Sequence, residues 1–312
     1  MTKPGETTLA RANVPVLKVA LATYPGTKAL KEHGTSFGAF AVEFAEIAPI
    51  SRAFAPMVRE LRFDISEMAL VTFLQAKAYG KPLVLLPVAV AARFQEPALL
   101  CRTDDKTISG PTGLVGRRVG VRAYSQTTGV WMRGILHDDY GITPDQIRWL
   151  TFEGAHVAEY ADPPWVERVA QGKDMLAMLR AGELDAVILG NDRPDDKGLR
   201  TVFADTDAAA ERFRTKHGFV PVNHMVVARR SLIDARPDLV AGFLDSLRAS
   251  LTAATLGAER GTALLVGRDA LQPAIDLALR YAAEQGLLPH PLKPEEVWDG
   301  LPPSILSMGR KA

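Results

Sequence analysis

The sequence predicts an α/β fold of two lobes, each a mixed, mostly parallel sheet flanked by helices. Two observations lead to this fold class. Apolar runs of strand length alternate with helical patterns along most of the 312 residues, as in parallel sheets that are covered by helices. A polar, turn-rich segment at 103–113 interrupts the alternation, which then begins again. We therefore expect the chain to cross into a second lobe at this segment.

The first part of the chain predicts short strands separated by helices. Strands are expected at 17–22, 39–44, 61–65, 82–90 and 98–102, and helices at 51–60 and 66–79. The longer helix is indicated by apolar residues at helical spacing, among them Val71, Phe73 and Leu74. Cys101 lies in an apolar run, which indicates a buried strand rather than a reactive thiol.

After the polar segment, strands are expected at 118–122, 147–152, 186–189 and 222–228, and helices at 127–140, 173–181, 207–217, 236–256 and 269–285. If the strand at 222–228 returns to the first sheet, the second lobe is an insertion. Lobe I then comprises residues 1–108 and 221–312, and lobe II comprises 109–220. Two crossings, near 103–113 and 218–222, would act as a double hinge that lets a cleft close on a ligand.

The composition is that of an ordinary soluble globular protein. The chain is 47% hydrophobic and 23% charged, and its formal net charge of +1 gives no reason to expect nucleic acid as a partner. No run of about 18 apolar residues suggests a membrane segment. The first residues lack the apolar core of a secretory signal, so the expected location is the cytoplasm. The sequence leaves a homo-oligomer open.

The turn after the strand at 118–122 is the strongest candidate for a binding site. Tyr124, Ser125, Thr127 and Thr128 surround the start of a helix, where backbone N–H groups and the helix dipole favour a carboxylate. The hydroxyls could instead only cap the helix. Trp131 lies one turn further on and could stack on an aromatic ligand, although core packing is the favoured role.

A second turn of this kind is expected at Ser66, between the strand at 61–65 and the helix at 66–79. Asp64 and Glu67 could accept hydrogen bonds from ligand hydroxyls, or Ser66 and Glu67 could simply be a helix cap and its dipole-matched acid. Arg59 and Arg93 are candidate clamps for carboxylates because a guanidinium matches their geometry. Arg122 and Arg133 look more peripheral.

Histidines supply the candidate proton donors. His224 follows the expected return to lobe I and would border the cleft, with Asn223 beside it to orient a ligand; His156 is the reserve donor. A buried structural histidine is the alternative for each. No pattern of metal ligands, phosphate-binding loop, nucleophile elbow or dinucleotide fingerprint occurs, so neither a metal nor a cofactor is expected.

The segments 63–69, 119–140, 182–186 and 220–225, taken together, resemble the 4,5-dihydroxyphthalate decarboxylase family. The resemblance implies a fold like that of type II periplasmic binding proteins, with the ligand in the cleft between the lobes. At 87–96 the chain departs from the family pattern, with Ala89 and Val90 early and Glu96 late. An acid at that late position would repel an anionic substrate at close range.

The function implied by the resemblance is the non-oxidative decarboxylation of a hydroxylated aromatic dicarboxylate such as 4,5-dihydroxyphthalate, without a cofactor. Protonation of the ring carbon that carries the carboxylate, aided by a ring hydroxyl, would release CO2 and leave a dihydroxybenzoate. We expect His224 to deliver the proton, Asp64 or Glu67 to engage the hydroxyls, and the turn at 125–128 with an arginine to hold a carboxylate. The alternative is a solute-binding protein that closes on a small aromatic carboxylate without reaction.

Overall fold

The computed structural model describes residues 14–32, 40–190, 193–255 and 265–306 of the 312-residue chain. Within these ranges the strands are β1 (Val16–Ala20), β2 (Ala41–Phe44), β3 (Ile65–Ala69), β4 (Leu83–Ala92), β5 (Leu99–Arg102), β6 (Arg118–Val121), β7 (Arg148–Thr151), β8 (Val166–Arg168), β9 (Ala186–Ile188), β10 (Leu199–Thr201) and β11 (Val222–Arg229). The α-helices are α1 (Pro25–Glu32), α2 (Phe54–Glu60), α3 (Leu70–Ala78), α4 (Thr127–Tyr140), α5 (Met175–Arg180), α6 (Thr206–His217), α7 (Arg230–Ala235), α8 (Pro237–Thr255), α9 (Arg268–Glu284) and α10 (Pro303–Leu306). Short 3-10 helices include η1 (Ile50–Ala53) and η2 (Glu96–Ala98).

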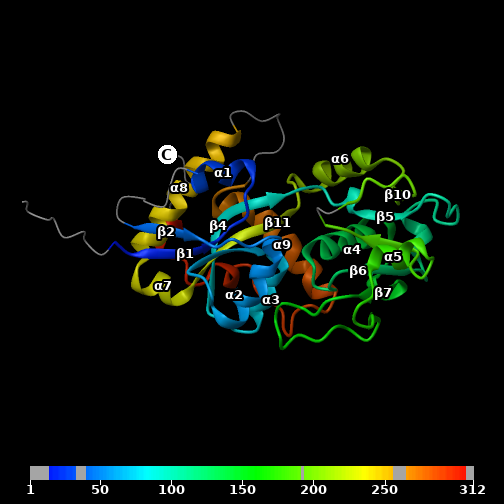
Figure 1. Cartoon of the computed structure of the whole chain (residues 1–312), viewed down its shortest axis with the longest axis horizontal. Coiled ribbons are helices and arrows are strands. Elements are labelled where there is room, and N and C mark those ends of the chain that lie inside the picture. The colour runs from blue at the N-terminus through cyan, green and yellow to red at the C-terminus, as the bar shows by residue number, and fades with distance from the viewer. Residues whose placement is uncertain (1–13, 33–39, 191–192, 256–264, 307–312) are drawn as a thin grey trace, which may run out of the picture.

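The strands form two sheets, which lie side by side in Figure 1 and define the two lobes. The first sheet has the order β2-β1-β3-β11-β4, with β1 parallel to β2 and β3, and with β11 antiparallel to both of its neighbours. The second has the order β10-β5-β9-β6-β7-β8, with parallel pairs around β6 and antiparallel pairs around β5. The predicted class, two mixed sheets flanked by helices, is confirmed.

The chain changes sheet twice, and the first change is earlier than expected. Because β5 pairs with β9 and β10, the first crossing lies between β4 and β5, at 93–98. The expected crossing at 103–113 is wrong: this segment joins β5 to β6 within the second lobe. The return crossing runs from α6 to β11, and β11 rejoins the first sheet. The two crossings touch, because the backbone N–H of Arg93 donates to the carbonyl of Pro221 at 3.0 Å.

The predicted helix at 66–79 begins four residues too early. Residues 65–69 are strand β3, the centre of the first sheet, and α3 starts only at Leu70. The predicted strand at 61–65 is likewise four residues too early, because β3 spans 65–69. The remaining predicted elements agree with the structure to within a few residues, while α1, α7, α10, β8 and β10 are not predicted. Positions 39 and 256, which bound two of the predicted elements, lie outside the described residues.

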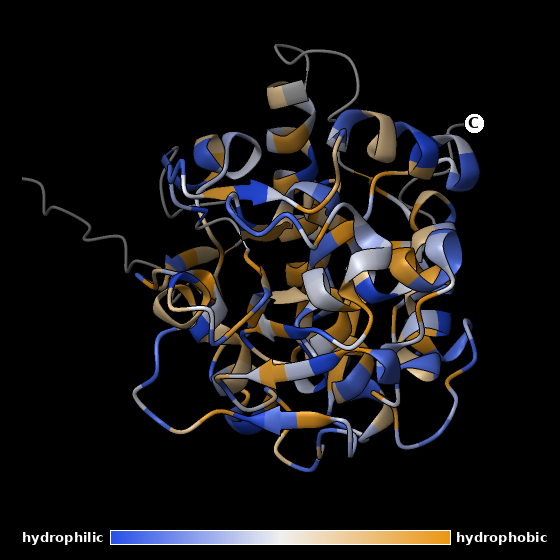
Figure 2. Ribbon diagram, turned by 90° about the vertical axis from the view of Figure 1, so that its right-hand side faces the viewer, coloured by the Kyte–Doolittle hydropathy of each residue, from blue (hydrophilic) through white to orange (hydrophobic). Residues whose placement is uncertain are grey.

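One hydrophobic core extends through both lobes. It includes Val19 and Ile65 of the first sheet, Val119 of the second sheet, and Trp131 where α4 packs against α9. A smaller cluster on the other face of the second sheet is covered by α5. Figure 2 shows hydrophobic residues along the inner strands and hydrophilic residues on outer loops and helices. None of the helices in the described ranges is both long and apolar enough to cross a lipid bilayer.

Candidate functional site

A cavity of about 1150 Å³ opens between the two lobes. Its wall in the first lobe comes from the turn after β1, the segment around η1 and α2, the start of α3, the end of β4 and the first residues of β11. Its wall in the second lobe comes from the start of α4, the loop at 153–156, the start of α5 and the end of β9. Both lobes therefore contribute to one site, at the ends of their central strands.

Two helix starts face each other across this cavity. The N-cap residue of α3 is Ala69 and that of α4 is Gln126, and both line the cavity. The helices meet where the backbone N–H of Val71 donates to Oγ1 of Thr127 at 3.2 Å. Helix starts carry unpaired N–H groups and the positive end of the dipole, so the arrangement favours an anion. Two helix starts meet at the cavity, but the helix of the first lobe begins after Ala69 and not at Ser66, as expected from the sequence.

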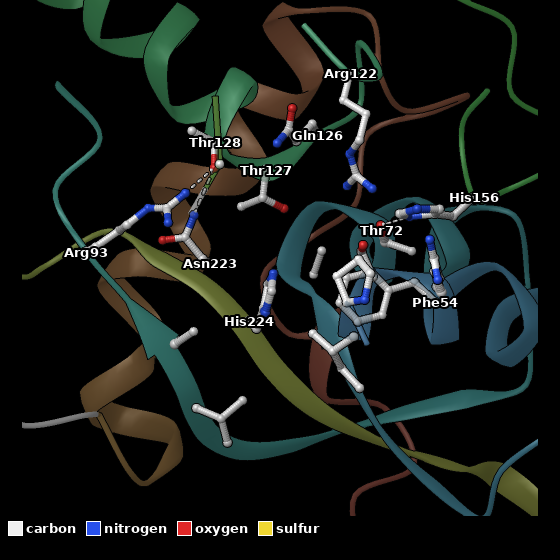
Figure 3. Close-up of a pocket in the computed structure, with 18 of the residues that line it drawn as sticks. Phe54, Thr72, Arg93, Arg122, Gln126, Thr127, Thr128, His156, Asn223 and His224 are labelled. Atoms are coloured by element: carbon white, nitrogen blue, oxygen red, sulfur yellow. Dashed lines mark hydrogen bonds between the residues drawn. The ribbon is translucent and has the colours of Figure 1, made fainter. Parts of the chain in front are cut away.

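A polar cluster lies on the β4 side of the cavity (Figure 3). Oγ1 of Thr128 accepts hydrogen bonds from the guanidinium of Arg93 at 3.0 Å and from Nδ2 of Asn223 at 3.3 Å. Behind them, Nε2 of Gln95 donates to Oδ1 of Asn223 at 2.9 Å. A hydroxyl can accept two hydrogen bonds and donate one. Since Thr128 already accepts two, its own proton is the group that remains for a ligand oxygen.

His224 lines the cavity and is backed by a buried carboxylate. Its Nδ1 lies 2.6 Å from Oε1 of Glu67, whose side chain has no exposed surface. The same oxygen accepts the hydroxyl of Tyr24 at 2.6 Å, and Oε2 accepts the backbone N–H of Ala22 at 2.9 Å. Burial, together with Glu67, raises the pKa of Tyr24 above its ordinary value, so its phenol keeps its proton. With Nδ1 engaged, Nε2 is the nitrogen of His224 that is left for the cavity.

Sheet geometry explains why Glu67 and His224 meet. In the antiparallel pair of β3 and β11, Glu67 is opposite Val226 and Ala69 is opposite His224. Alternate residues of a strand point to the same face, and diagonal neighbours on that face are within reach of long side chains. The two residues are far apart in the sequence, but the register makes them diagonal neighbours.

His156 is a second imidazole on the cavity wall. Its Nδ1 lies 2.8 Å from Oγ1 of Thr72, in the first turn of α3. Burial, together with the charges of Arg122 and Arg59, lowers the pKa of His156 to about 4. The ring is therefore neutral at neutral pH. The ring of Phe54 meets both imidazoles edge to face, with centroids 5.5 Å from His156 and 5.2 Å from His224.

Positive charge dominates the wall. The arginines on it are Arg52, Arg59, Arg93 and Arg122, whereas the acids are Glu153 and Asp174. Asp174 caps α5 by accepting the N–H of Ala177, and Glu153 is 3.4 Å from Arg122. Figure 3 shows the guanidinium of Arg122 directed into the space between Thr127 and His156. Arg122, which the sequence suggests is peripheral, is thus part of the site.

Seven of the predicted site residues line the cavity: Arg59, Arg93, Thr127, Thr128, His156, Asn223 and His224. Their roles stay predictions. Two N–H groups of Arg59 donate to backbone carbonyls in a loop of the other lobe, those of Ala155 and His156, each at 2.8 Å. Glu67 is not on the wall and would act through His224 rather than on ligand hydroxyls.

Other predicted ligand contacts are not on the cavity wall. Asp64 pairs with Arg229 at 2.5 Å, and Ser66 donates to the carbonyl of Glu67 inside the sheet. Trp131 is a core residue that donates to the carbonyl of Val222 at 2.9 Å. The structure thus contradicts contact of these residues with a ligand in the cavity.

The start of α4 also buries two predicted contacts. Tyr124 is fully buried, its ring 3.8 Å from the guanidinium carbon of Arg133, and Ser125 is 4% exposed. Both belong to the turn but do not line the cavity, so the binding surface of this turn consists of Gln126, Thr127 and Thr128. Arg133 is likewise buried and does not line the cavity.

The expected repulsion by Glu96 is also wrong. Glu96 lies in η2, is 1% exposed and does not line the cavity; burial raises the pKa of its carboxyl. Of the two early positions at which the chain departs from the family pattern, Val90 is on the wall and Ala89 is not. Their effect on the site is therefore a short apolar surface, not a negative charge.

Sequence reasoning misses four residues of the site: Tyr24, Phe54, Thr72 and Gln126. Tyr24 precedes Pro25 at the first position of α1, and a proline there is a helix-start signal. That signal would have identified the turn between β1 and α1, which lies at the same edge of the sheet as the turn between β3 and α3. Among the described residues, no group of three or more His, Cys, Asp or Glu side chains is arranged to hold a metal ion.

Comparison with known proteins gives two relatives by sequence, both named 4,5-dihydroxyphthalate decarboxylase. The protein of Comamonas testosteroni is 28% identical over 217 residues, covering 62% of this chain and 63% of the relative. The protein of Pseudomonas putida is 29% identical over 140 residues, covering 42% of this chain and 53% of the relative. The matches span less than two thirds of the relatives' own length. No family model matches the chain.

Solved structures give the fold. The periplasmic aliphatic sulphonate binding protein of Escherichia coli has a TM-score of 0.57 and 13% identity, over 92% of this chain and 98% of that protein. The alkanesulfonate-binding protein of Xanthomonas axonopodis pv. citri, bound to MOPS, has a TM-score of 0.60 and 14% identity, with the same coverage of both chains. A ligand binding component of an ABC-type import system from Staphylococcus aureus has a TM-score of 0.58 and 11% identity, over 96% of this chain and 100% of that protein.

The resemblance to 4,5-dihydroxyphthalate decarboxylases is confirmed by the two relatives, and the periplasmic-binding-protein fold by the solved structures. At these identities the solved structures establish architecture and nothing about the ligand. Fold by itself does not determine activity, because chemistry depends on the side chains of the site.

Proposed function

We propose that this protein is a non-oxidative decarboxylase of a hydroxylated aromatic dicarboxylate such as 4,5-dihydroxyphthalate, which it converts to a dihydroxybenzoate and CO2. The observation that carries the proposal is the contact of His224 with Glu67, 2.6 Å apart, on the wall of a cavity rich in arginine. The names of the two relatives support the same activity. The cytoplasmic location expected from the sequence remains a prediction, and a homo-oligomer remains open.

The reaction needs an acid aimed at a ring carbon. Loss of CO2 directly from an aromatic carboxylate would leave an aryl anion, so the ring carbon is protonated first. His224 is suited to this step because Glu67 accepts at Nδ1, fixes the ring and compensates the charge of an imidazolium. Nε2–H then transfers its proton to the carbon that carries the carboxylate. The C–C bond breaks, its electron pair restores the aromatic ring, and solvent returns a proton to His224.

The carboxylates of the substrate would bind where the wall offers donors. One candidate position is the Arg93, Thr128 and Asn223 cluster, in which the hydroxyl proton of Thr128 remains for a ligand. The other is the first turn of α4, where the N–H groups and the helix dipole favour an anion beside that cluster. Two separate positions for anions are the feature that favours a dicarboxylate over a monoacid.

The ring would lie against an apolar part of the wall that includes Ile50, Phe54, Val90 and Ile188. The ring of Phe54 packs edge to face with both imidazoles and covers part of their surface. Exclusion of water favours loss of the charged carboxylate as neutral CO2. The site thus combines donors for carboxylates with an apolar surface for the ring, as a dicarboxylated ring requires.

The alternative is a solute-binding protein for a small aromatic carboxylate. It is favoured by the solved structures with the same fold, two of which are sulfonate-binding proteins by name. A sulfonate and a carboxylate are both anions that arginines and helix starts can hold. The pairing of His224 with a buried carboxylate favours the enzyme, because it fixes an imidazole that can transfer a proton at the ligand surface.

The experiment that separates the two functions is incubation of the purified protein with 4,5-dihydroxyphthalate while CO2 and the dihydroxybenzoate are measured. We expect both products in equal amounts. Phthalate, which lacks the hydroxyls, is the matched control and should bind without releasing CO2. A rise in the melting temperature with 4,5-dihydroxyphthalate but no CO2 would establish the binding protein and reject the enzyme.

A further inference from the structure

Two imidazoles approach the same part of the cavity from different elements. His224 comes from β11 and His156 from the loop after β7, and both contact the ring of Phe54. None of the described residues hydrogen-bonds Nε2 of either ring, whereas Nδ1 of each is engaged. One aromatic ligand in the cavity can therefore be reached by two imidazole Nε2 atoms.

The partners at Nδ1 differ in charge. His224 is bonded to the carboxylate of Glu67, which compensates an imidazolium, while His156 is bonded to the neutral hydroxyl of Thr72. Arg59 and Arg122 face His156 and oppose a charge on it, and the pKa of His156, lowered by burial to about 4, agrees. Only His224 therefore has a carboxylate that compensates a positive charge on its ring, whereas a neutral His156 offers the lone pair of its second nitrogen.

We propose that His156 is the general base that accepts the proton of a ring hydroxyl while His224 protonates the ring carbon para to it. The inference rests on the proposed function and adds a second catalytic residue to it. It requires the Nδ1–H of His156 to donate to Oγ1 of Thr72, so that Nε2 carries the lone pair. Arg122 lies beside the phenol-bearing end and stabilises the oxygen as its proton leaves.

The steps balance without a further reactant. As the bond from Nε2 of His224 to its hydrogen breaks and the new C–H bond forms, the hydroxyl proton passes to Nε2 of His156 and the ring becomes a dienone. The C–C bond to the carboxylate then breaks, CO2 leaves as a neutral molecule, and the proton from His224 stays on the ring carbon. The electron pair restores the aromatic ring, and the oxygen regains its proton from His156. The net change consumes one proton, which His224 recovers from solvent.

The test is a comparison of two substrates in the wild type and in His156→Asn. The asparagine amide can replace the contact with Thr72 but does not titrate. The substrates are 4,5-dihydroxyphthalate and its analogue with fluorine next to one hydroxyl, which is more acidic and depends less on a base. We expect the variant to lose roughly 10²-fold in kcat on the parent substrate, as for removal of a general base. On the fluorinated analogue the variant should approach the wild type.

A purely structural role for His156 gives a different pattern. Equal losses on both substrates, or no loss on either, would overturn the inference while the wild-type enzyme still releases CO2. Thr72→Ser and Thr72→Val form the matched control pair, because only the first keeps the hydroxyl that orients the imidazole. We expect Thr72→Val to follow His156→Asn and Thr72→Ser to follow the wild type. Absence of CO2 with the wild type would instead reject the proposed function.

Discussion

Glu67 is a carboxylate in the middle of a buried strand, where an unpaired charge would be costly. It is tolerated because its oxygens accept from Tyr24, from the backbone of Ala22 and from His224. These contacts satisfy the carboxylate and fix the imidazole in one orientation. The hydrogen bond that offsets the burial of Glu67 therefore also fixes the His224 imidazole on the cavity wall.

His156 should make stability depend on pH. Its pKa is lowered from the ordinary 6.5 to about 4, so the unfolded chain takes up a proton first as the pH falls. The stabilisation is complete above pH 6.5, and we expect it to be lost as the pH falls toward about 4. The loss is at most about 3 kcal/mol, at 1.36 kcal/mol per pKa unit.

Urea unfolding of the wild type and of His156→Asn, measured at neutral pH and at about pH 4, checks this. The wild type should lose more unfolding free energy between the two conditions than the variant does. The same loss in both proteins would mean that His156 is protonated as easily in the fold as in the unfolded chain. That result would also remove the electrostatic support for a neutral His156.

The individual residues of the site are predictable where a local signal exists. Thr127, Thr128 and Asn223 follow from hydroxyls and amides at a helix start and a crossing, and the structure has them on the cavity wall. The pairing of Glu67 with His224 is not predictable in this way, because it depends on strand register across 157 positions. Phe54 and Thr72 likewise carry no local signal, since an aromatic or a threonine on a helix is ordinary core material.

Strand β3 shows how pairing overrides local preference. In the sequence, Ser66 and Glu67 have the pattern of a helix N-cap followed by an acid in the first turn, which predicts a helix from 66 onward. In the fold, β3 is hydrogen-bonded to β1 on one side and to β11 on the other, so the strand continues to Ala69. Two neighbouring strands provide partners that a single helical turn could not match. The helix start moves to Leu70, where no side-chain cap is present.

Helix α4 begins and ends as the sequence predicts, but its tryptophan is structural. Trp131 donates to the carbonyl of Val222 and meets Phe213, Phe219 and Tyr281 edge to face or tilted. Gly134 of the same helix lets α9 approach, since a Cβ there would lie 2.2 Å from the ring of Tyr281. The side of α4 turned away from the cavity is therefore a packing surface.

Trp131→Phe should accordingly destabilise the fold and leave ligand binding almost unchanged. The buried carbonyl of Val222 loses its donor, which costs about 1–3 kcal/mol. Chemical unfolding and the affinity for 4,5-dihydroxyphthalate are the two measurements. Weaker binding at unchanged stability would contradict the assignment of Trp131 to the core and favour stacking on the ligand.

The two lobes are held together by contacts that flank the cavity. Arg59 of α2 reaches the backbone at 155–156, Lys81 pairs with Glu159 at 2.5 Å, and Val71 donates to Thr127. Together with the adjoining crossings at 93 and 221, these contacts enclose the site on several sides. A ligand that bridges the lobes would add to them.

The two-sheet architecture is predictable because alternating strands and helices leave few other topologies. The position of the first crossing is not. A polar loop such as 103–113 looks like a linker, whereas the real crossing at 93–98 is short and contains the buried Gln95 and Glu96. Polarity reports exposure to solvent, and it does not report which sheet the next strand joins.

The central claim is that a cleft between two lobes presents His224, backed by Glu67, as the acid for decarboxylation. The most direct test is single-turnover CO2 release from 4,5-dihydroxyphthalate by the wild type and two variants. The first variant is His224→Gln. The second combines His224→Gln with Glu67→Gln, so that no buried charge is left unpaired. Binding of the substrate is measured alongside by calorimetry. We predict a loss of at least roughly 10²-fold in the rate for both variants, with affinity largely kept. Full turnover by either folded variant would contradict the account.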